Sequence, residues 1–202
     1  MKGRILLTIV FIMSSAALVF SEGPIRQPGT NPKSWQRILR ITGTAAGDAG
    51  RPELKIILVS SAWYGTTDWD NPTYYNPKDL VRYWGMECTY YQGLYEDDGD
   101  YWQTVVFPPV HWQMYYFDDM GNPTYAEFGA QYLEWWPLEL WTWNGPEGYW
   151  EFLYNTWGNT DPFLVNVTDR VNDGNLIVIC FDPYQEVMQS ITVDFALVYA
   201  EY

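Results

Sequence analysis

Residues 161–202 read DPFLVNVTDRVNDGNLIVICFDPYQEVMQSITVDFALVYAEY, and this stretch decides the fold class. It contains three runs rich in β-branched and aromatic residues, which are residues 161–168, 175–181 and 190–202. The middle run is continuously apolar, as is typical of a central strand covered on both faces. Asp173-Gly174 separates the first two runs and is a strong signal for a tight hairpin turn. The stretch therefore predicts antiparallel strands joined by short turns.

The last run alternates over its whole length and predicts one long strand. One face is expected to carry Ile191, Val193, Phe195, Leu197 and Tyr199. The other face is expected to carry Thr192, Asp194, Ala196 and Val198.

From Glu53 onward the rest of the chain follows the same pattern of short aromatic and β-branched segments between turn signals. Further strand candidates are residues 53–60, 80–91, 101–107, 110–117, 124–136 and 138–143. Residues 64–79 contain two Asn-Pro pairs and predict a long loop. One short helix is expected near residues 146–157, because Pro146 suits a first helical turn. We predict an all-β protein with a single antiparallel β-sandwich over residues 53–202.

The stretch from Pro162 to Val178 resembles a motif of jelly-roll sandwich domains that reads F-x-V-x-V-T-D-x-V-x-x-G-x-N-x-L-x-V. Those domains include the galactose-binding-like sandwich of β-galactosidase-type glycosidases and modules of secreted or surface proteins. Here the turn is one residue shorter, between Gly174 and Asn175. The resemblance implies a jelly-roll-like sandwich. It transfers no catalytic residue, because such sandwiches serve as lectins, spacers and assembly modules alike.

The first 21 residues have the pattern of a secretory signal peptide. Lys2 and Arg4 precede an apolar run from Ile5 to Phe20, and Ser21 supplies a small residue before a cut. A retained anchor is the alternative, because this apolar run of 16 residues can barely span a bilayer. Cleavage predicts a secreted, extracellular or cell-surface protein with no membrane span.

The net charge of the chain limits the classes of partner that it is expected to bind. Cleavage removes two basic residues and no acidic one, so the net charge of −14 becomes −16. Such a charge argues against binding to nucleic acid and to anionic lipid. It favours bound cations and an extracellular medium. The 12 Trp, 17 Tyr and 9 Phe residues exclude a disordered chain.

Residues 22–52 predict an extended N-terminal segment that contains a strand at 35–42 and a flexible linker rich in Gly and Ala. This strand is expected to complete its own sheet or the sheet of a neighbouring copy. The residues that would make the exchange are Trp35, Ile38, Leu39 and Ile41. Exchange between copies is head-to-tail and generates a homopolymeric filament.

Aromatic and acidic residues gather near the centre of the chain. Two adjacent segments predict a face made of Tyr132, Glu134, Trp136, Glu139, Trp141 and Trp143. Rings stack on sugar faces and carboxylates accept bonds from sugar hydroxyls, so the face suits a polysaccharide. A protein partner or simple burial are the alternatives. Glu134 and Glu139 are also weighed as the acid and base of a small glycoside hydrolase.

Acidic and amide side chains on turns suggest Ca²⁺, which prefers hard oxygen ligands. The candidate ligands are Asp97, Asp98, Asp100, Asp169, Asn172 and Asp173. Ordinary turn chemistry is the alternative for each cluster.

Three residue types bear on chemistry and processing. Cys88 and Cys180 either form a disulfide in an oxidising compartment or remain buried thiols. Asn166 is the acceptor of an N-glycosylation sequon. His111 is the only histidine and is expected at the surface, so a catalytic triad has no support.

These observations lead to three hypotheses of function. The first is a secreted, non-catalytic structural or adhesive protein that assembles with copies of itself. The second is a carbohydrate-binding module, and the third is a glycoside hydrolase.

Overall fold

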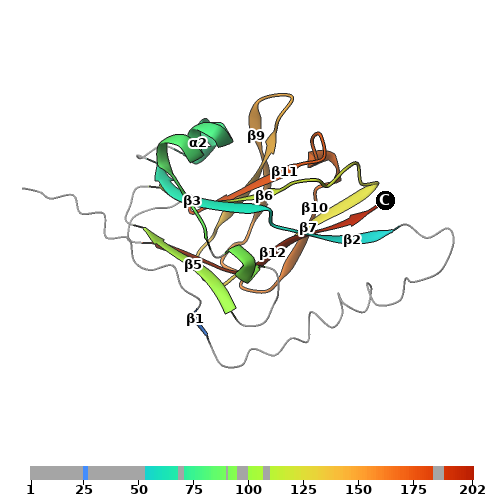
Figure 1. Cartoon of the computed structure of the whole chain (residues 1–202). Helices are drawn as coiled ribbons and strands as arrows, with labels where there is room; N and C mark the ends of the chain where they lie inside the picture. The colour runs from blue at the N-terminus through green and yellow to red at the C-terminus, as the bar shows by residue number, and fades with distance from the viewer. Residues whose placement is uncertain are drawn as a thin grey trace, which may run out of the picture.

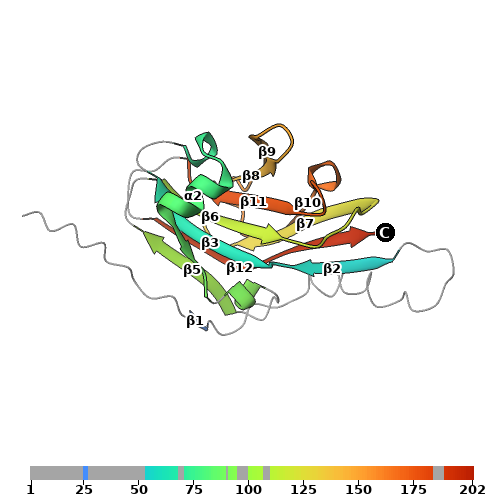
Figure 2. The ribbon, with the colours of Figure 1, turned by 45° about the horizontal axis from the view of Figure 1, so that its top comes forward.

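The computed structural model describes residues 25–26, 53–67, 71–89, 91–94, 100–106, 110–183 and 189–202. Antiparallel strands form two six-stranded sheets that stack face to face (Figures 1 and 2). The first sheet contains β1 (Ile25–Arg26), β2 (Leu54–Leu58), β5 (Asp100–Val106), β7 (Tyr125–Tyr132), β10 (Phe163–Asn166) and β12 (Gln189–Glu201). The second contains β3 (Ser61–Thr67), β4 (Gly85–Glu87), β6 (Val110–Phe117), β8 (Glu139–Asn144), β9 (Tyr149–Asn155) and β11 (Leu176–Phe181). The predicted all-β antiparallel sandwich is confirmed.

The apolar core fills the space between the sheets. Strands run in the order β1-β5-β12-β7-β10 in the first sheet, with β2 also paired to β12, and β4-β3-β6-β11-β8-β9 in the second. Phe117 of β6 meets Phe128 of β7 edge to face across this space, with ring centroids 6.0 Å apart. Such an edge-to-face pair adds to the stabilisation that burial provides.

The predicted alternation of the last segment, which forms strand β12, is wrong beyond Val193. Val193 and Phe195 pair with the successive β7 residues Tyr132 and Gln131, so Asp194 is an extra residue in a β-bulge. A one-residue slip moves every later side chain to the other face. Ile191 and Val193 belong to the main core, and after the bulge the core positions are Ala196, Val198 and Ala200. Phe195, Leu197 and Tyr199 form a separate cluster instead.

The expected helix at residues 146–157 is wrong. Residues 145–148 form the hairpin turn between β8 and β9, closed by a bond from the Gly148 amide to the Asn144 carbonyl at 2.8 Å. Trp150 and Phe152 are two residues apart and pair with the tryptophans of β8, so this segment forms a strand rather than the helix that its weak helical spacing suggested.

Within the described residues, the α-helix is α2 (Pro77–Trp84), inside the segment expected to be a loop running into a strand. Asn76 caps it by accepting a bond from the Asp79 amide at 2.9 Å, and Pro77 occupies the first turn. Three shorter 3-10 turns accompany it, which are η1 (Pro72–Tyr74), η2 (Tyr91–Leu94) and η3 (Thr168–Arg170).

The Asp173-Gly174 turn is confirmed. Asn172 and Asn175 exchange two backbone hydrogen bonds of 2.8 and 2.9 Å. Asp173 has a φ of +50° and Gly174 a φ of +74°, as a two-residue hairpin turn that matches the strand twist requires.

The N-terminal predictions lie largely outside the described residues, including the strand at 35–42 and the signal peptide. Ile25–Arg26 pairs with Asp100 and Tyr101 of β5 at one edge of the first sheet. In the described part of the chain, no helix combines the length and the apolar character that a membrane crossing requires.

Candidate functional site

The outer face of the second sheet, the face turned away from the first sheet, is apolar and rich in aromatic rings. Its half-buried rings include Trp63, Tyr116, Trp141 and Trp143, which pack around a buried group. That buried group consists of Leu80, Val110, Trp112, Met114, Trp150, Ile179 and Phe181. An apolar outer face is unusual for a sheet that has already buried its inner face in a core.

Helix α2 covers one end of this outer face (Figures 1 and 2). Leu80 is fully buried there, and the Trp84 carbonyl lies against Gly65 of β3. A Cβ at Gly65 would collide with that carbonyl and with the Trp112 ring, so glycine permits the close approach. Trp150 of β9 donates its Nε1 hydrogen to the Tyr75 carbonyl at 2.7 Å, which ties the covering segment to the far edge of the sheet.

The other end of the outer face carries two aromatic pairs across the β8–β9 hairpin. Trp141 meets Phe152 with ring centroids 5.4 Å apart, and Trp143 meets Trp150 at 5.3 Å. Both pairs are edge to face, so each presents one ring face and one ring edge. Cross-strand aromatic pairs of this kind stabilise a sheet as well as shaping its surface.

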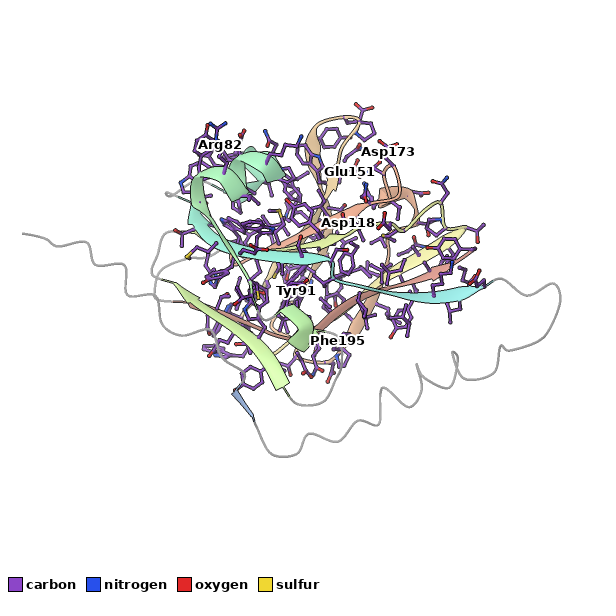
Figure 3. All side chains as sticks on the ribbon, viewed as in Figure 1. Arg82, Tyr91, Asp118, Glu151, Asp173 and Phe195 are labelled. Carbon is purple, nitrogen blue, oxygen red and sulfur yellow. The ribbon has the colours of Figure 1, made fainter. Side chains whose placement is uncertain are left out.

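An open cleft of about 510 Å³ lies beside this aromatic end. Trp143 and Ile177 are its apolar lining, from neighbouring strands β8 and β11. One wall is the β8–β9 turn at Gly145 and Pro146, and the other is the Asp173-Gly174 turn with its flanking asparagines Asn172 and Asn175. In Figure 3 the labelled residues Glu151 and Asp173 lie on this side of the molecule, and Phe195 lies on the other.

Hydrogen bonds hold the aromatic end in place. The Trp141 Nε1 hydrogen is donated to Glu139 Oε2 at 3.0 Å, which orients that ring. Asn172 donates its Nδ2 hydrogens to the Trp143 carbonyl at 3.3 Å and the Arg170 carbonyl at 3.0 Å, so one wall of the cleft is tied to β8. Arg170 in turn forms an ion pair with Glu151 of β9.

The structure brings together half of the predicted aromatic and acidic face. Glu139, Trp141 and Trp143 alternate on β8 and share the outer face, as predicted. Tyr132 points into the core and is buried. Trp136 packs against that same core. The face predicted from both segments is therefore split, because Tyr132 belongs to the other sheet and faces inward.

Glu134 and Glu139 do not form a catalytic pair. Glu134 is buried and accepts a bond from Ser190 of β12, in the first sheet, at 3.3 Å. Burial raises its pKa from 4.5 to about 7, against the lowering effect of hydrogen bonds from Thr192 and Ser190. Glu139 lies half-exposed on the outer face of the second sheet. The two carboxyls therefore share no groove in which acid and base could act on one bond.

The candidate calcium ligands are used in local turn geometry where they are described. Asn172 bonds to backbone carbonyls, and Asp169 and Asp173 are exposed on separate turns. Among the described residues, no three acidic, His or Cys side chains converge. Asp97 and Asp98 lie outside the described residues, and for Asp100 only the backbone of β5 is described. Calcium binding stays a prediction.

Cys88 and Cys180 are both buried, and no disulfide joins them in the structure. The Cys88 amide bonds to Ala62 of β3, whereas Cys180 lies on β11, and β6 separates these strands. Three strand spacings lie between the two residues, from Cys88 to β3, from β3 to β6 and from β6 to β11. At about 4.8 Å each, they separate the two residues by roughly 14 Å along the sheet, beyond the reach of a disulfide. The sequon residue Asn166 is exposed at the end of β10, where glycosylation stays a prediction.

Sequence reasoning missed two highly exposed tryptophans. Trp135 and Trp157 are 80% and 78% exposed, and Gly158 packs against the Trp135 backbone. Both lie in loops, and only their large apolar rings between polar turn residues could have signalled them. The same reasoning missed the cleft wall, because the turns that build it are 27 residues apart, counting from Pro146 to Asp173.

Comparison with known proteins assigns no family to this chain. No protein-family model matches the chain, and no curated protein matches it. Among solved structures, the chain is similar to the crystal structure of a carbohydrate-binding module specific for non-crystalline cellulose, CBM28. The identity is 15%, the TM-score is 0.31, and the match covers 48% of this chain and 74% of that one. The assignment of a β-sandwich stands on the strand pairing of this chain itself.

Proposed function

We propose that this protein is a non-catalytic carbohydrate-binding module with a jelly-roll-like sandwich, and that it binds a polysaccharide in the cleft beside Trp143. The observation that carries the proposal is the composition of that cleft. Its lining combines the Trp143 ring and Ile177 with the polar side chains Asn172, Asp173 and Asn175. Sugar rings need an apolar surface for their C–H faces and polar groups for their hydroxyls.

The polar wall has the bonding capacity that a sugar requires. Within the described residues, the structure pairs the Asp173 carboxylate with no donor, so it can accept bonds from two hydroxyls. The Asn175 Nδ2 donates to the Asp173 carbonyl at 3.1 Å, which leaves the Asn175 side-chain oxygen as an acceptor. The openness of the cleft toward solvent suits a chain that runs past it, rather than a small molecule enclosed by it.

A catalytic role is less well supported than binding. General acid–base hydrolysis of a glycosidic bond requires two carboxyls that flank that bond. The described lining of the cleft contains one carboxylate, Asp173. Glu139 is engaged with the Trp141 indole, and Glu134 lies beside β12. This arrangement supports recognition without bond cleavage.

The proposal is tested by titrating soluble polysaccharides of different backbones into the full chain and following tryptophan fluorescence and heat. We expect Trp143→Ala to weaken binding by about 1 kcal/mol or more, roughly fivefold. Trp157→Ala, which removes an exposed ring that does not line the cleft, is the matched control and should bind like the wild type. Loss of binding in Trp157→Ala but not in Trp143→Ala would place the site at the loops instead. The absence of binding across the panel would overturn the proposal.

We also propose, as a second candidate, assembly between copies through the N-terminal segment. The observation that favours it is the edge of β2, whose outer side pairs with no other strand in the described residues. Ile56 and Leu58 on this strand are 41% and 40% exposed. Exposed apolar edges of this kind accept an added strand.

Deletion of residues 22–42 tests this second candidate. The full mature chain should form polymers in light scattering at raised concentration, and the deleted chain should remain monomeric. Adding the missing peptide back should raise the melting temperature of the deleted chain. A full chain that stays monomeric at all concentrations would contradict assembly and leave carbohydrate binding untouched.

A further inference from the structure

Four buried polar side chains from consecutive strands meet between the two sheets. Thr104 lies on β5 in the first sheet, and His111, Gln113 and Tyr115 alternate along β6 in the second. All four are at most 3% exposed, so the expectation of a surface histidine is wrong. Buried polar groups destabilise a core unless they are fully engaged, and a network of them usually has a specific role.

The Thr104 hydroxyl is oriented toward the imidazole of His111. Thr104 Oγ1 lies 2.7 Å from His111 Nε2 and 2.7 Å from Gln113 Nε2. The amide nitrogen of Gln113 has only hydrogens to offer, so it donates to the threonine oxygen. In the tautomer of His111 that carries its hydrogen on Nδ1, the ring Nε2 accepts the hydroxyl hydrogen of Thr104. This is the arrangement of a nucleophile beside its general base.

The carboxamide of Gln113 is held in one orientation. Its Nε2 donates to the Ile191 carbonyl of β12 at 2.9 Å, and a carbonyl oxygen can only accept, which excludes the flipped amide. Oε1 therefore faces Tyr115, whose hydroxyl donates to it at 2.5 Å. Burial raises the pKa of Tyr115 well above its usual value of 10, so the phenol remains a hydrogen donor.

We propose that Thr104 and Gln113 join in an intramolecular ester that the folded protein forms by itself. Thr104 Oγ1 attacks the side-chain carbonyl carbon of Gln113, Cδ, and its proton passes to His111 Nε2. The Tyr115 hydroxyl stabilises the negative charge that develops on Oε1. The Cδ–Nε2 bond then breaks, His111 returns the proton to the departing nitrogen, and ammonia leaves. One C–O bond replaces one C–N bond, so no oxidant or further reactant is required.

The ester would connect the two sheets covalently. Thr104 and Gln113 belong to strands that follow one another in the chain but pair in different sheets. The hydrogen bond that now joins them across the core would become a permanent link. The reaction depends on the folded arrangement, because the unfolded chain holds neither the base nor the oxyanion donor in place.

The intact mass of the purified, folded full chain tests the proposal. We expect the wild type to weigh less than its sequence by the mass of one ammonia. Thr104→Val keeps the shape of the side chain without the hydroxyl, and it should have the full sequence mass. His111→Asn should leave Thr104 and Gln113 in contact and slow the formation of the ester by about 100-fold or more.

Peptide mapping locates the loss. Fragmentation of a wild-type peptide that contains residues 104–113 should give no backbone fragments between these two positions, because the ester closes a ring around them. Hydroxylamine should open the ring and leave a hydroxamate at position 113. The wild-type map decides the question even if a variant fails to fold.

Two results would overturn the proposal. One is a natively folded wild type that keeps its full mass and linear peptides after several days in mildly alkaline buffer. The other is an ammonia loss that maps to Asn144-Gly145, where a succinimide forms by a different reaction.

Discussion

Trp143 of β8 and Trp150 of β9 stand opposite one another, with ring centroids 5.3 Å apart and planes at 67°. Trp143 is half-exposed and lines the cleft, whereas Trp150 is buried and donates to the Tyr75 carbonyl. This pair connects the proposed binding surface to the segment that leads into α2. The position of the cleft therefore depends on how firmly that segment is docked.

We expect Trp150→Phe to destabilise the protein by about 1–3 kcal/mol, because it removes the hydrogen bond from the Trp150 indole to the Tyr75 carbonyl and reduces buried contact area. Urea unfolding followed by circular dichroism measures the change. Tyr149→Phe, at the exposed neighbouring position, is the matched control and should change stability by less than about 0.5 kcal/mol. Equal effects of the two changes would contradict the docking role of Trp150.

Gly174→Ala should destabilise the protein by about 1–2 kcal/mol, because alanine resists the φ of +74° at this position. The added Cβ would also lie 3.2 Å from the Gly121 amide nitrogen, which is tighter than an ordinary contact. Thermal unfolding measures the effect. Gly145→Ala is the control, because its Cβ would have its nearest neighbour, Trp143 Nε1, at 3.8 Å. A Gly174→Ala protein as stable as the wild type would mean that the turn can change its type.

Stability should fall as pH rises from about 4.5 to about 7, because of Glu134. In the folded protein the Glu134 carboxyl stays protonated up to its raised pKa of about 7, whereas in the unfolded chain it releases the proton near pH 4.5. Between these values the folded state binds more protons, so raising the pH favours unfolding, by up to about 3 kcal/mol in total.

Glu134→Gln tests this pH dependence, because glutamine has the shape of the protonated acid and cannot ionise. The variant should lose this part of the pH dependence and be more stable than the wild type above pH 7. Glu139→Gln, on the half-exposed outer face, is the control and should retain the wild-type slope. Urea unfolding across the range measures both. If Glu134→Gln retained the full slope, another buried acid would be responsible.

Asn76→Ala should destabilise the protein by about 1 kcal/mol, because the Asp79 amide at the start of α2 loses its acceptor. Asn71→Ala removes a similar cap from η1 and serves as a comparison, with a smaller effect expected for so short an element. Chemical denaturation measures both changes. A null effect at Asn76 would indicate that packing of Leu80 alone holds the helix in place.

Local signals in the sequence predicted local structure well. Asp173-Gly174 predicted its own turn, because the left-handed φ values it requires are a property of those two residues. Asn76-Pro77 is an equally local signal, because a capping residue followed by proline is typical of the start of a helix such as α2. The prediction of a loop here was wrong, because the Asn-Pro pair is common both in loops and at the start of helices.

Properties that depend on partners far away in the chain could not be predicted. Whether Tyr132 faces the core or the solvent depends on its pairing with Val193, 61 residues later. Trp141 and Trp143 were placed on a common face by their alternation alone, but the wall opposite Trp143 comes from the β10–β11 turn. The alternation along β6, which groups His111 with Gln113 and Tyr115 on one face, favoured a solvated His111. Only the contact between the two sheets shows that His111 meets Thr104.

The bulge at Asp194 has a consequence for how this chain can vary over time. Because Val193 and Phe195 already pair with the successive residues Tyr132 and Gln131, deletion of Asp194 would leave a regular ladder with Ala196, Val198 and Ala200 still facing the core. Closing the bulge with Asp194 retained would instead turn Phe195, Leu197 and Tyr199 inward. A core packed around two alanines and a valine has no room for two aromatic rings and a leucine. Descendants of this sequence can therefore lose one residue at Asp194, whereas a single-residue deletion between Phe195 and Ala200 would turn the later side chains to the other face and should be eliminated by selection.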